Sequence, residues 1–258
     1  FFVGAVGKVQ AGDIHAGFHQ TSDFSNATAT AHWYIINAIE VFAEKNARAV
    51  VVLGNSITDG RGSTTDQQNR WTDNLSRRLL ENKSTKRVAV LNMGLGGNCI
   101  LNGGLGPTGR SRYNRDLFQQ EGVKYIILFE GVNDLGGYGD AVAKAKQIIE
   151  VYKQIIDEAH ERGIYVYGGT VMQFKGNNYY SENHEEGRQL LNDWIRNGGY
   201  FDGLIDFDKA MGSEDDPARL NPKFLFENDW LHPNADGYVH MGNCIDLELF
   251  SRMGSPAK

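Results

Sequence analysis

Short apolar runs alternate with helix-like segments along most of the chain, and this alternation constrains the fold more than any other feature. The runs are rich in β-branched and aromatic residues: AVVVL (49–53), VAVLN (88–92), VKYIILF (123–129), IYVYGGT (164–170) and GLIDF (203–207). Parallel strands that are buried on both faces have this composition. Helical spacing is clearest at 139–162 and weaker at 70–82, 111–121, 184–198 and 234–252. The succession predicts an α/β fold with helices on both faces of a parallel sheet.

The alternation begins near residue 49, and no linker rich in Pro, Gly or Ser divides the chain after that point. We therefore expect one domain at 49–258. Residues 1–48 show weak periodicity and do not fit the strand–helix alternation. We interpret them as an N-terminal extension packed on the main domain.

Charge and composition exclude several classes of protein. A net charge of -6 gives no basic footprint for nucleic acid. The longest apolar runs are too short to span a bilayer. The two cysteines, Cys99 and Cys244, either pair or are both free, and the chain has neither CxxC spacing nor a Cys/His cluster. We therefore expect no metal site and no cofactor.

Polar and glycine-rich loops follow the predicted strands, where ligands bind in open parallel sheets. GNSITDG (54–60) follows the first strand, NMGLGGN (92–98) the second and EGVND (130–134) the third. A fourth loop, NDWLHPN (228–234), precedes the last predicted helix. We expect these loops to lie at one edge of the sheet.

Together the loops supply the groups that acyl transfer requires. The hydroxyl of Ser56 needs a base to become a nucleophile, and His232 can take its proton while Asp229 orients the imidazole. A backbone N–H at Gly97 and the side-chain N–H of Asn133 can stabilise an oxyanion. Taken singly, each group also fits a turn or a helix cap. Their joint occurrence, in this order along the chain, favours the catalytic interpretation.

These four motifs resemble the blocks of the SGNH (GDSL-type) hydrolase family. The resemblance implies a flavodoxin-like three-layer α/β/α sandwich with strand order 2-1-3-4-5. It also implies that Ser56 is the nucleophile, His232 the base and Asp229 its orienting acid. The Ser56 and Gly97 N–H groups and the Asn133 side chain would form the oxyanion hole. One departure is Asn55, where the family usually has Asp.

The chain looks closest to secreted or cell-envelope esterases that include xylan-acetylesterase-like proteins. This resemblance implies hydrolysis of short-chain, chiefly acetyl, esters on plant cell-wall carbohydrate or a small molecule. The loop FKGNNYYSE (174–182) follows the fourth strand, and its aromatic and amide side chains fit a sugar ring. The candidate substrate-binding residues are Asn55, Glu130, Asn178, Tyr179 and Tyr180. A lysophospholipase or arylesterase, and an inactive carbohydrate-binding module, remain alternatives.

Two rival folds fit the motifs less well. An α/β-hydrolase requires G-x-S-x-G, but Thr58 lies two residues after Ser56. The segment GLGPTG (104–109) matches the dinucleotide pattern G-x-G-x-x-G, with Glu130 about twenty residues on. However, this segment contains Pro107 and starts about a dozen residues after the preceding strand. Nucleotide binding is therefore the weaker hypothesis.

Overall fold

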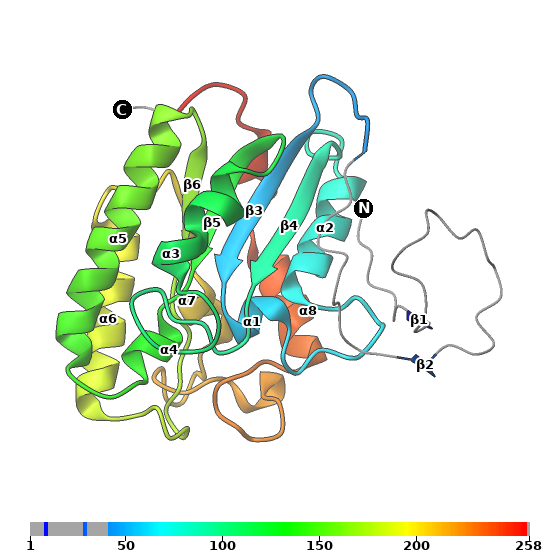
Figure 1. Ribbon diagram of the computed structural model, residues 1–258. Helices are drawn as coiled ribbons and strands as arrows, with labels where there is room; N and C mark the ends of the chain where they lie inside the picture. The colour runs from blue at the N-terminus through cyan, green and yellow to red at the C-terminus, as the bar shows by residue number, and fades with distance from the viewer. Residues whose placement is uncertain (1–7, 10–27, 30–40, 257–258) are drawn as a thin grey trace.

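The five predicted strands form one parallel sheet in the computed structural model, which describes residues 8–9, 28–29 and 41–256 (Figure 1). They are β3 (Arg48–Gly54), β4 (Val88–Gly94), β5 (Val123–Phe129), β6 (Tyr165–Gly169) and β7 (Gly203–Ile205). Their order in the sheet is β4-β3-β5-β6-β7, which is 2-1-3-4-5 in chain order. The predicted topology is confirmed.

The register brings the ends of the three central strands to one level. Gly54, the last residue of β3, pairs with Gly94 of β4 and with Phe129 of β5. Because these strands are parallel, the loops that follow them leave the sheet at the same edge. The loops after β3, β4 and β5 are therefore neighbours in space, as the sequence predicts.

Helices lie on both sides of the sheet. Figure 1 shows α5 (Ala141–Glu161) and α6 (Glu182–Asn197) side by side on one side of it, and α2 (Trp71–Glu81) and α8 (Ala235–Cys244) on the other. Their buried faces carry the apolar residues: Leu75 and Leu79 in α2, for example, are fully buried. The chain is thus the predicted α/β sandwich.

Several short helices differ from the prediction. The predicted helix 111–121 is divided into α3 (Gly109–Tyr113) and a π-helix (Asn114–Phe118), and 234–252 into α8 and a 3-10 helix (Leu247–Ser251). Four further short helices were not predicted: α1 (Ser56–Asp59), α4 (Val132–Leu135), α7 (Phe207–Met211) and a 3-10 turn (Pro222–Phe224). Such helices are too short to show a hydrophobic period. The first two carry Ser56 and Asn133.

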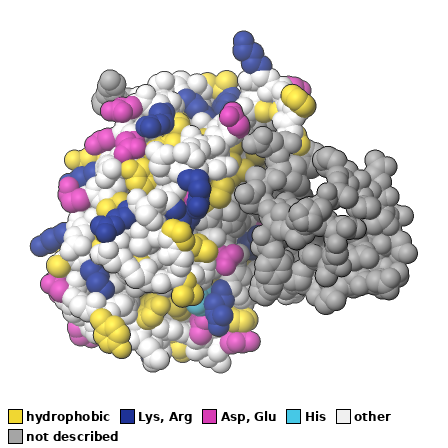
Figure 2. Space-filling model, in the orientation of Figure 1, with side chains coloured by type: hydrophobic (Ala, Val, Ile, Leu, Met, Phe, Trp, Pro, Cys, Tyr) yellow, Lys and Arg dark blue, Asp and Glu magenta, His cyan; other side chains and the backbone are white. Residues whose placement is uncertain are grey.

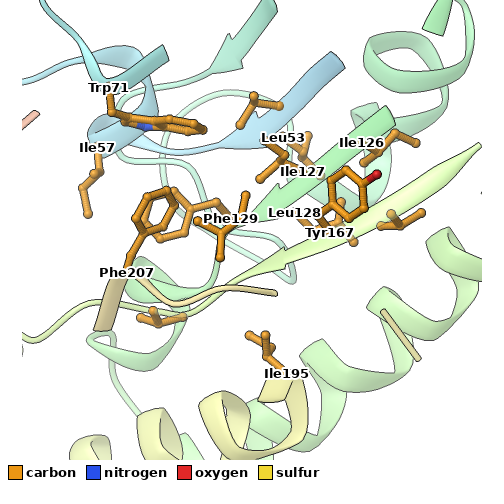
Figure 3. Packing of buried hydrophobic residues seen from close by; sticks show 14 of the residues in the cluster. Leu53, Ile57, Trp71, Ile126, Ile127, Leu128, Phe129, Tyr167, Ile195 and Phe207 are labelled. Carbon is orange, nitrogen blue, oxygen red and sulfur yellow. The ribbon is translucent and has the colours of Figure 1, made fainter. Parts of the chain in front are cut away.

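An aromatic cluster lies close to the end of β5. Figure 3 shows the Trp71 ring facing Phe129 and Phe207, with ring centroids 6.2 Å and 5.3 Å from that of Trp71. Phe129 directly precedes Glu130, and the buried Ile57, next to Ser56, belongs to the same core. Edge-to-face aromatic pairs add about 0.5–1.5 kcal/mol each beyond their burial. This packing supports the loops that leave the sheet.

The predicted packing of residues 1–48 on the main domain falls largely outside the described residues. Within that range, β1 (Lys8–Val9) pairs antiparallel with β2 (Thr28–Ala29). The division into 1–48 and 49–258 stays a prediction. No helix in the described part of the chain has the length and apolarity needed to cross a membrane.

Acidic and basic side chains are interspersed over the described part of the face in Figure 2. With a net charge of -6, this distribution offers no basic stripe there for a nucleic-acid backbone.

Candidate active site

Ser56 lies in a tight turn between β3 and α1. Gly54 permits this turn, since a Cβ there would lie 2.2 Å from the Oγ1 of Thr58. Asn55 then caps α1, because its Oδ1 accepts a hydrogen bond from the backbone N–H of Ile57 (3.1 Å). Ser56 is consequently the first residue of the helix. Its side chain points toward the imidazole of His232.

Three side chains from distant parts of the sequence form a hydrogen-bonded chain. Ser56 Oγ lies 2.8 Å from His232 Nε2, and His232 Nδ1 lies 2.6 Å from Asp229 Oδ2. The second carboxylate oxygen of Asp229 accepts the backbone N–H groups of Leu231 and His232, both at 2.9 Å. The carboxylate therefore fixes both the ring and its loop. With the proton on Nδ1, Nε2 can accept from the serine hydroxyl.

The imidazole of His232 is held in its neutral form. Burial lowers the pKa of His232 below its usual value of 6.5, and the hydrogen bond and charge of Asp229 oppose this shift. Because burial is the larger cause, the ring can accept a proton at neutral pH. A neutral imidazole next to a serine hydroxyl is the form that general-base chemistry requires.

The three N–H groups predicted for the oxyanion hole belong to Ser56, Gly97 and Asn133. Gly97 has a φ of +67°, and a Cβ there would lie 2.9 Å from Leu105. The backbone N–H groups of Ser56 and Gly97 donate to no acceptor in the described part of the chain. In α4, the amide of Asn133 donates to the backbone oxygen of Asn98 at 2.7 Å. An amide has two N–H groups, so one remains for a ligand.

Asn55 and Glu130 contact each other rather than solvent. Asn55 Nδ2 donates to Glu130 Oε2 at 3.1 Å, and Arg112 Nη2 lies 3.4 Å from Glu130 Oε1. Burial raises the pKa of Glu130 to about 8, although Asn55 and Arg112 both act to lower it. The sequence analysis suggested that both side chains contact substrate. Because both are buried, we now expect them to hold the Ser56 turn instead.

Arg112 was missed by the sequence analysis. Its buried guanidinium donates to the carbonyls of Gly54 and Met93, at the ends of β3 and β4, to the side-chain oxygen of Asn98 and to the carboxylate of Asp116. The spacing of Arg112 and Asp116 in SRYNRD fits a helical ion pair, but nothing local indicates the other partners. Arg112 thus joins the ends of neighbouring strands beneath the site.

The 174–182 loop divides into residues with different contacts. Asn178 is exposed, and Tyr180 is half-exposed with its hydroxyl on Glu182 and Lys175 over its ring. Substrate contact by these two residues stays a prediction. Tyr179 is different, because its hydroxyl lies 3.0 Å from Asn133 Oδ1. Asn177, which was not singled out in the sequence, donates to the backbone oxygen of Asp229 at 2.6 Å.

The remaining candidates lie outside the hydrogen-bonded chain. The segment 104–109 folds back onto the Gly97 loop, where Leu105 N donates to Gly97 O at 2.9 Å, and does not open from a strand. Cys99 and Cys244 are both free, and burial raises the pKa of each thiol, to about 12 and about 11. Among the described residues, no three His, Cys, Asp or Glu side chains gather in a way that could hold a metal ion.

A family model agrees with this geometry. Residues 52–239 match the model of the GDSL-like lipase/acylhydrolase family. The chain belongs to this family. It is therefore a hydrolase of the esterase or acylhydrolase type, as the four motifs predicted. The matched range includes all five residues that the sequence analysis assigned to catalysis and the oxyanion hole.

Solved structures with the same fold come from several bacteria. A member of the lipolytic G-D-S-L family from Veillonella parvula superposes with a TM-score of 0.53 at 19% identity, covering 80% of this chain and 100% of that one. A GDSL-like lipase from Bacteroides thetaiotaomicron gives 0.55 at 16% identity, covering 81% and 89%. A carbohydrate acetylesterase family member from Sinorhizobium meliloti gives 0.56 at 16%, covering 78% and 96%.

At identities of 16–19%, these structures show that the fold is shared and show nothing further about this chain. A comparison with curated proteins finds no match.

Proposed function

We propose that this GDSL-like hydrolase is a serine esterase that removes short acyl groups, chiefly acetyl, from carbohydrate. The observation that carries the proposal is the chain of contacts from Ser56 Oγ to His232 Nε2 (2.8 Å) and from His232 Nδ1 to Asp229 Oδ2 (2.6 Å). A nucleophile, a base and an orienting acid in this order are the requirement for acyl transfer through a serine.

The reaction has two stages. Ser56 Oγ attacks the ester carbonyl while His232 Nε2 takes the hydroxyl proton, and Asp229 stabilises the imidazolium. When the tetrahedral intermediate collapses, the C–O bond to the alcohol breaks and Nε2 gives its proton to the leaving oxygen. Water then attacks the acyl-serine, with His232 acting as base again. The products are the free acid, the alcohol and the original enzyme.

The oxyanion of each tetrahedral intermediate requires donors that are already in position. The backbone N–H groups of Ser56 and Gly97 and the free N–H of Asn133 supply them, from the ends of β3, β4 and β5. Elsewhere, removal of one such donor lowers kcat by about 10²–10³-fold. Their lack of other acceptors in the described part of the chain supports this assignment.

Two observations support a small acyl group on a sugar. Ser56 and His232 expose only 8% and 7% of their surfaces, so little of the reacting side chains is accessible to a substrate. Beside the site, Asn178 and Tyr180 are open to solvent and offer the amide and aromatic surfaces that sugar rings contact. The carbohydrate acetylesterases of similar fold agree with this substrate class. A polysaccharide substrate would place the enzyme outside the cell or in its envelope.

The test compares wild type with Ser56→Ala on p-nitrophenyl acetate, butyrate and octanoate, and measures acetate release from acetylated xylan. The acetate ester should be the fastest substrate. Ser56→Ala should lower kcat by at least about 10⁴-fold while the thermal unfolding midpoint stays unchanged.

The outcomes separate the alternatives. Preference for octanoate without release from xylan would favour a lipid-type esterase such as a lysophospholipase. Folded wild-type protein that hydrolyses none of these esters would favour an inactive carbohydrate-binding module. Turnover that persists in Ser56→Ala would refute the assignment of the nucleophile.

A further inference from the structure

The Asn133 amide can serve an oxyanion only in one orientation. Its nitrogen must face the reacting carbonyl, because the amide oxygen would repel the negative charge. The contact of Asn133 Nδ2 with the backbone oxygen of Asn98 (2.7 Å) fixes one side of the amide. The other side, Oδ1, accepts the hydroxyl of Tyr179 at 3.0 Å. An acceptor and a donor thus hold the two ends of the group.

Tyr179 is itself firmly placed. Its ring packs on Gly136, the residue that ends α4, where a Cβ would lie 2.2 Å from the ring carbons. Its backbone N–H donates to Asn177 Oδ1 (3.0 Å), and its carbonyl lies 2.6 Å from His184 Nδ1 in α6. Burial raises the pKa of the Tyr179 hydroxyl, so the hydroxyl keeps its proton and remains a donor over the pH range in which an esterase works. A fixed donor on a fixed backbone orients its acceptor.

The same loop also contacts the other half of the site. Asn177 Nδ2 donates to the backbone oxygen of Asp229 at 2.6 Å. Gly176 has a φ of +108°, and a Cβ there would lie 2.7 Å from the ring of Trp230, the residue after Asp229. Asn177 therefore links Tyr179 to the segment that carries the acid of the triad.

We infer that Tyr179 is a positioning residue of this enzyme, which orients the Asn133 amide toward the oxyanion, and that Asn177 ties this support to the Asp229 loop. The inference rests on the proposed function, because only acyl transfer forms an oxyanion for the Asn133 amide to stabilise. It gives Tyr179 a different task from the sugar contact that the sequence suggested. It predicts that the Tyr179 hydroxyl acts on the transition state and only through Asn133.

The test removes one oxygen atom. Tyr179→Phe keeps the ring on Gly136 and loses only the hydroxyl. With p-nitrophenyl acetate, which has no sugar, we expect kcat to fall about tenfold, a part of the loss known for a whole oxyanion donor, with KM nearly unchanged. The matched control is Tyr113→Phe, a buried ring whose hydroxyl donates to Glu158 away from the site. It should keep wild-type kcat.

A double-mutant cycle separates positioning from a general structural effect. In the Asn133→Ala background the hydroxyl has no amide to orient, so adding Tyr179→Phe should lower kcat no further. Equal losses in both backgrounds, or a Tyr179→Phe kcat equal to that of Tyr113→Phe, would overturn the inference while Ser56→Ala still tests the proposed function separately. If the wild type shows no Ser56-dependent turnover, the proposed function fails and the inference falls with it.

Discussion

In the proposed mechanism, His232 sets the pH range in which the site can act. Only the neutral ring can take the proton of Ser56, and burial lowers the pKa of His232 below 6.5. At a pH below this pKa the imidazole of His232 is protonated and can no longer act as the base. We therefore expect kcat/KM to rise with pH along an acid limb whose midpoint lies below 6.5, in a pH–rate profile on p-nitrophenyl acetate. A midpoint at or above 6.5 would contradict the burial argument.

Asp229 acts on the same ring in the opposite direction. Its hydrogen bond and charge raise the pKa of His232, so Asp229→Asn should move the acid limb to still lower pH. The rate should also fall, by up to about 10⁴-fold, because the carboxylate no longer fixes the tautomer. Asp236→Asn is the control, since it removes an exposed charge nearby in α8. An acid limb that moves upward in Asp229→Asn would be inconsistent with this role.

At the scale of elements, Arg112 of α3 holds the ends of β3 and β4 together. Its guanidinium reaches Gly54 O at 3.0 Å and Met93 O at 2.8 Å, and it is paired with Asp116 and Glu130. Arg112→Met would leave the buried Asp116 carboxylate and the buried Glu130 carboxyl with fewer partners. We expect it to lower the free energy of unfolding by about 3 kcal/mol, measured by urea denaturation.

The neighbouring Arg110→Met serves as the control for Arg112→Met. Arg110 is exposed and donates to Asn102, so its loss should change stability by less than about 0.5 kcal/mol. Equal stability of the two variants would show that the buried network contributes nothing to the strand ends.

The sequence predicts the elements whose signal is local. Five strands were read from apolar runs and α5 from its period, and the structure has all of them. α1 and α4 were not predicted, because a single turn of helix shows no hydrophobic period. The π-helix after α3 was not predicted either, since its residues continue a helical pattern without a break.

The same limit applies to the site. Each of the five residues predicted for catalysis and the oxyanion hole occurs in a short motif: Ser56, Gly97, Asn133, Asp229 and His232. The structure brings Ser56, Asp229 and His232 into contact. The contacts of Arg112 and Tyr179 join residues far apart in the chain, and no local pattern encodes them. The burial of Glu130 could not be predicted either, because burial depends on the whole fold.

At the scale of the whole molecule, Glu130 couples stability to pH. In the folded protein its pKa is raised to about 8, while in the unfolded chain it is near 4.5. Between these values the folded state keeps a proton that the unfolded state has lost. The stability contributed by Glu130 is therefore full below about pH 4.5 and is lost as pH rises toward 8.

The variant Glu130→Gln should flatten this dependence. We expect the free energy of unfolding in urea to fall less between about pH 5 and about pH 8 in this variant than in wild type. Glu150→Gln, at an exposed position of α5, should keep the wild-type slope. Identical slopes for wild type and Glu130→Gln would show that this carboxyl is already ionised in the fold.

The central claim is that Ser56 forms a covalent bond with the acyl group. The most direct measurement is labelling with a p-nitrophenyl phosphonate, in which the serine oxygen attacks phosphorus and p-nitrophenolate leaves, followed by peptide mass mapping. We predict one adduct, on the peptide that contains Ser56, with matching loss of esterase activity and labelling strongly slowed in His232→Ala. Full labelling of Ser56→Ala, or an adduct on another residue of active enzyme, would contradict the account.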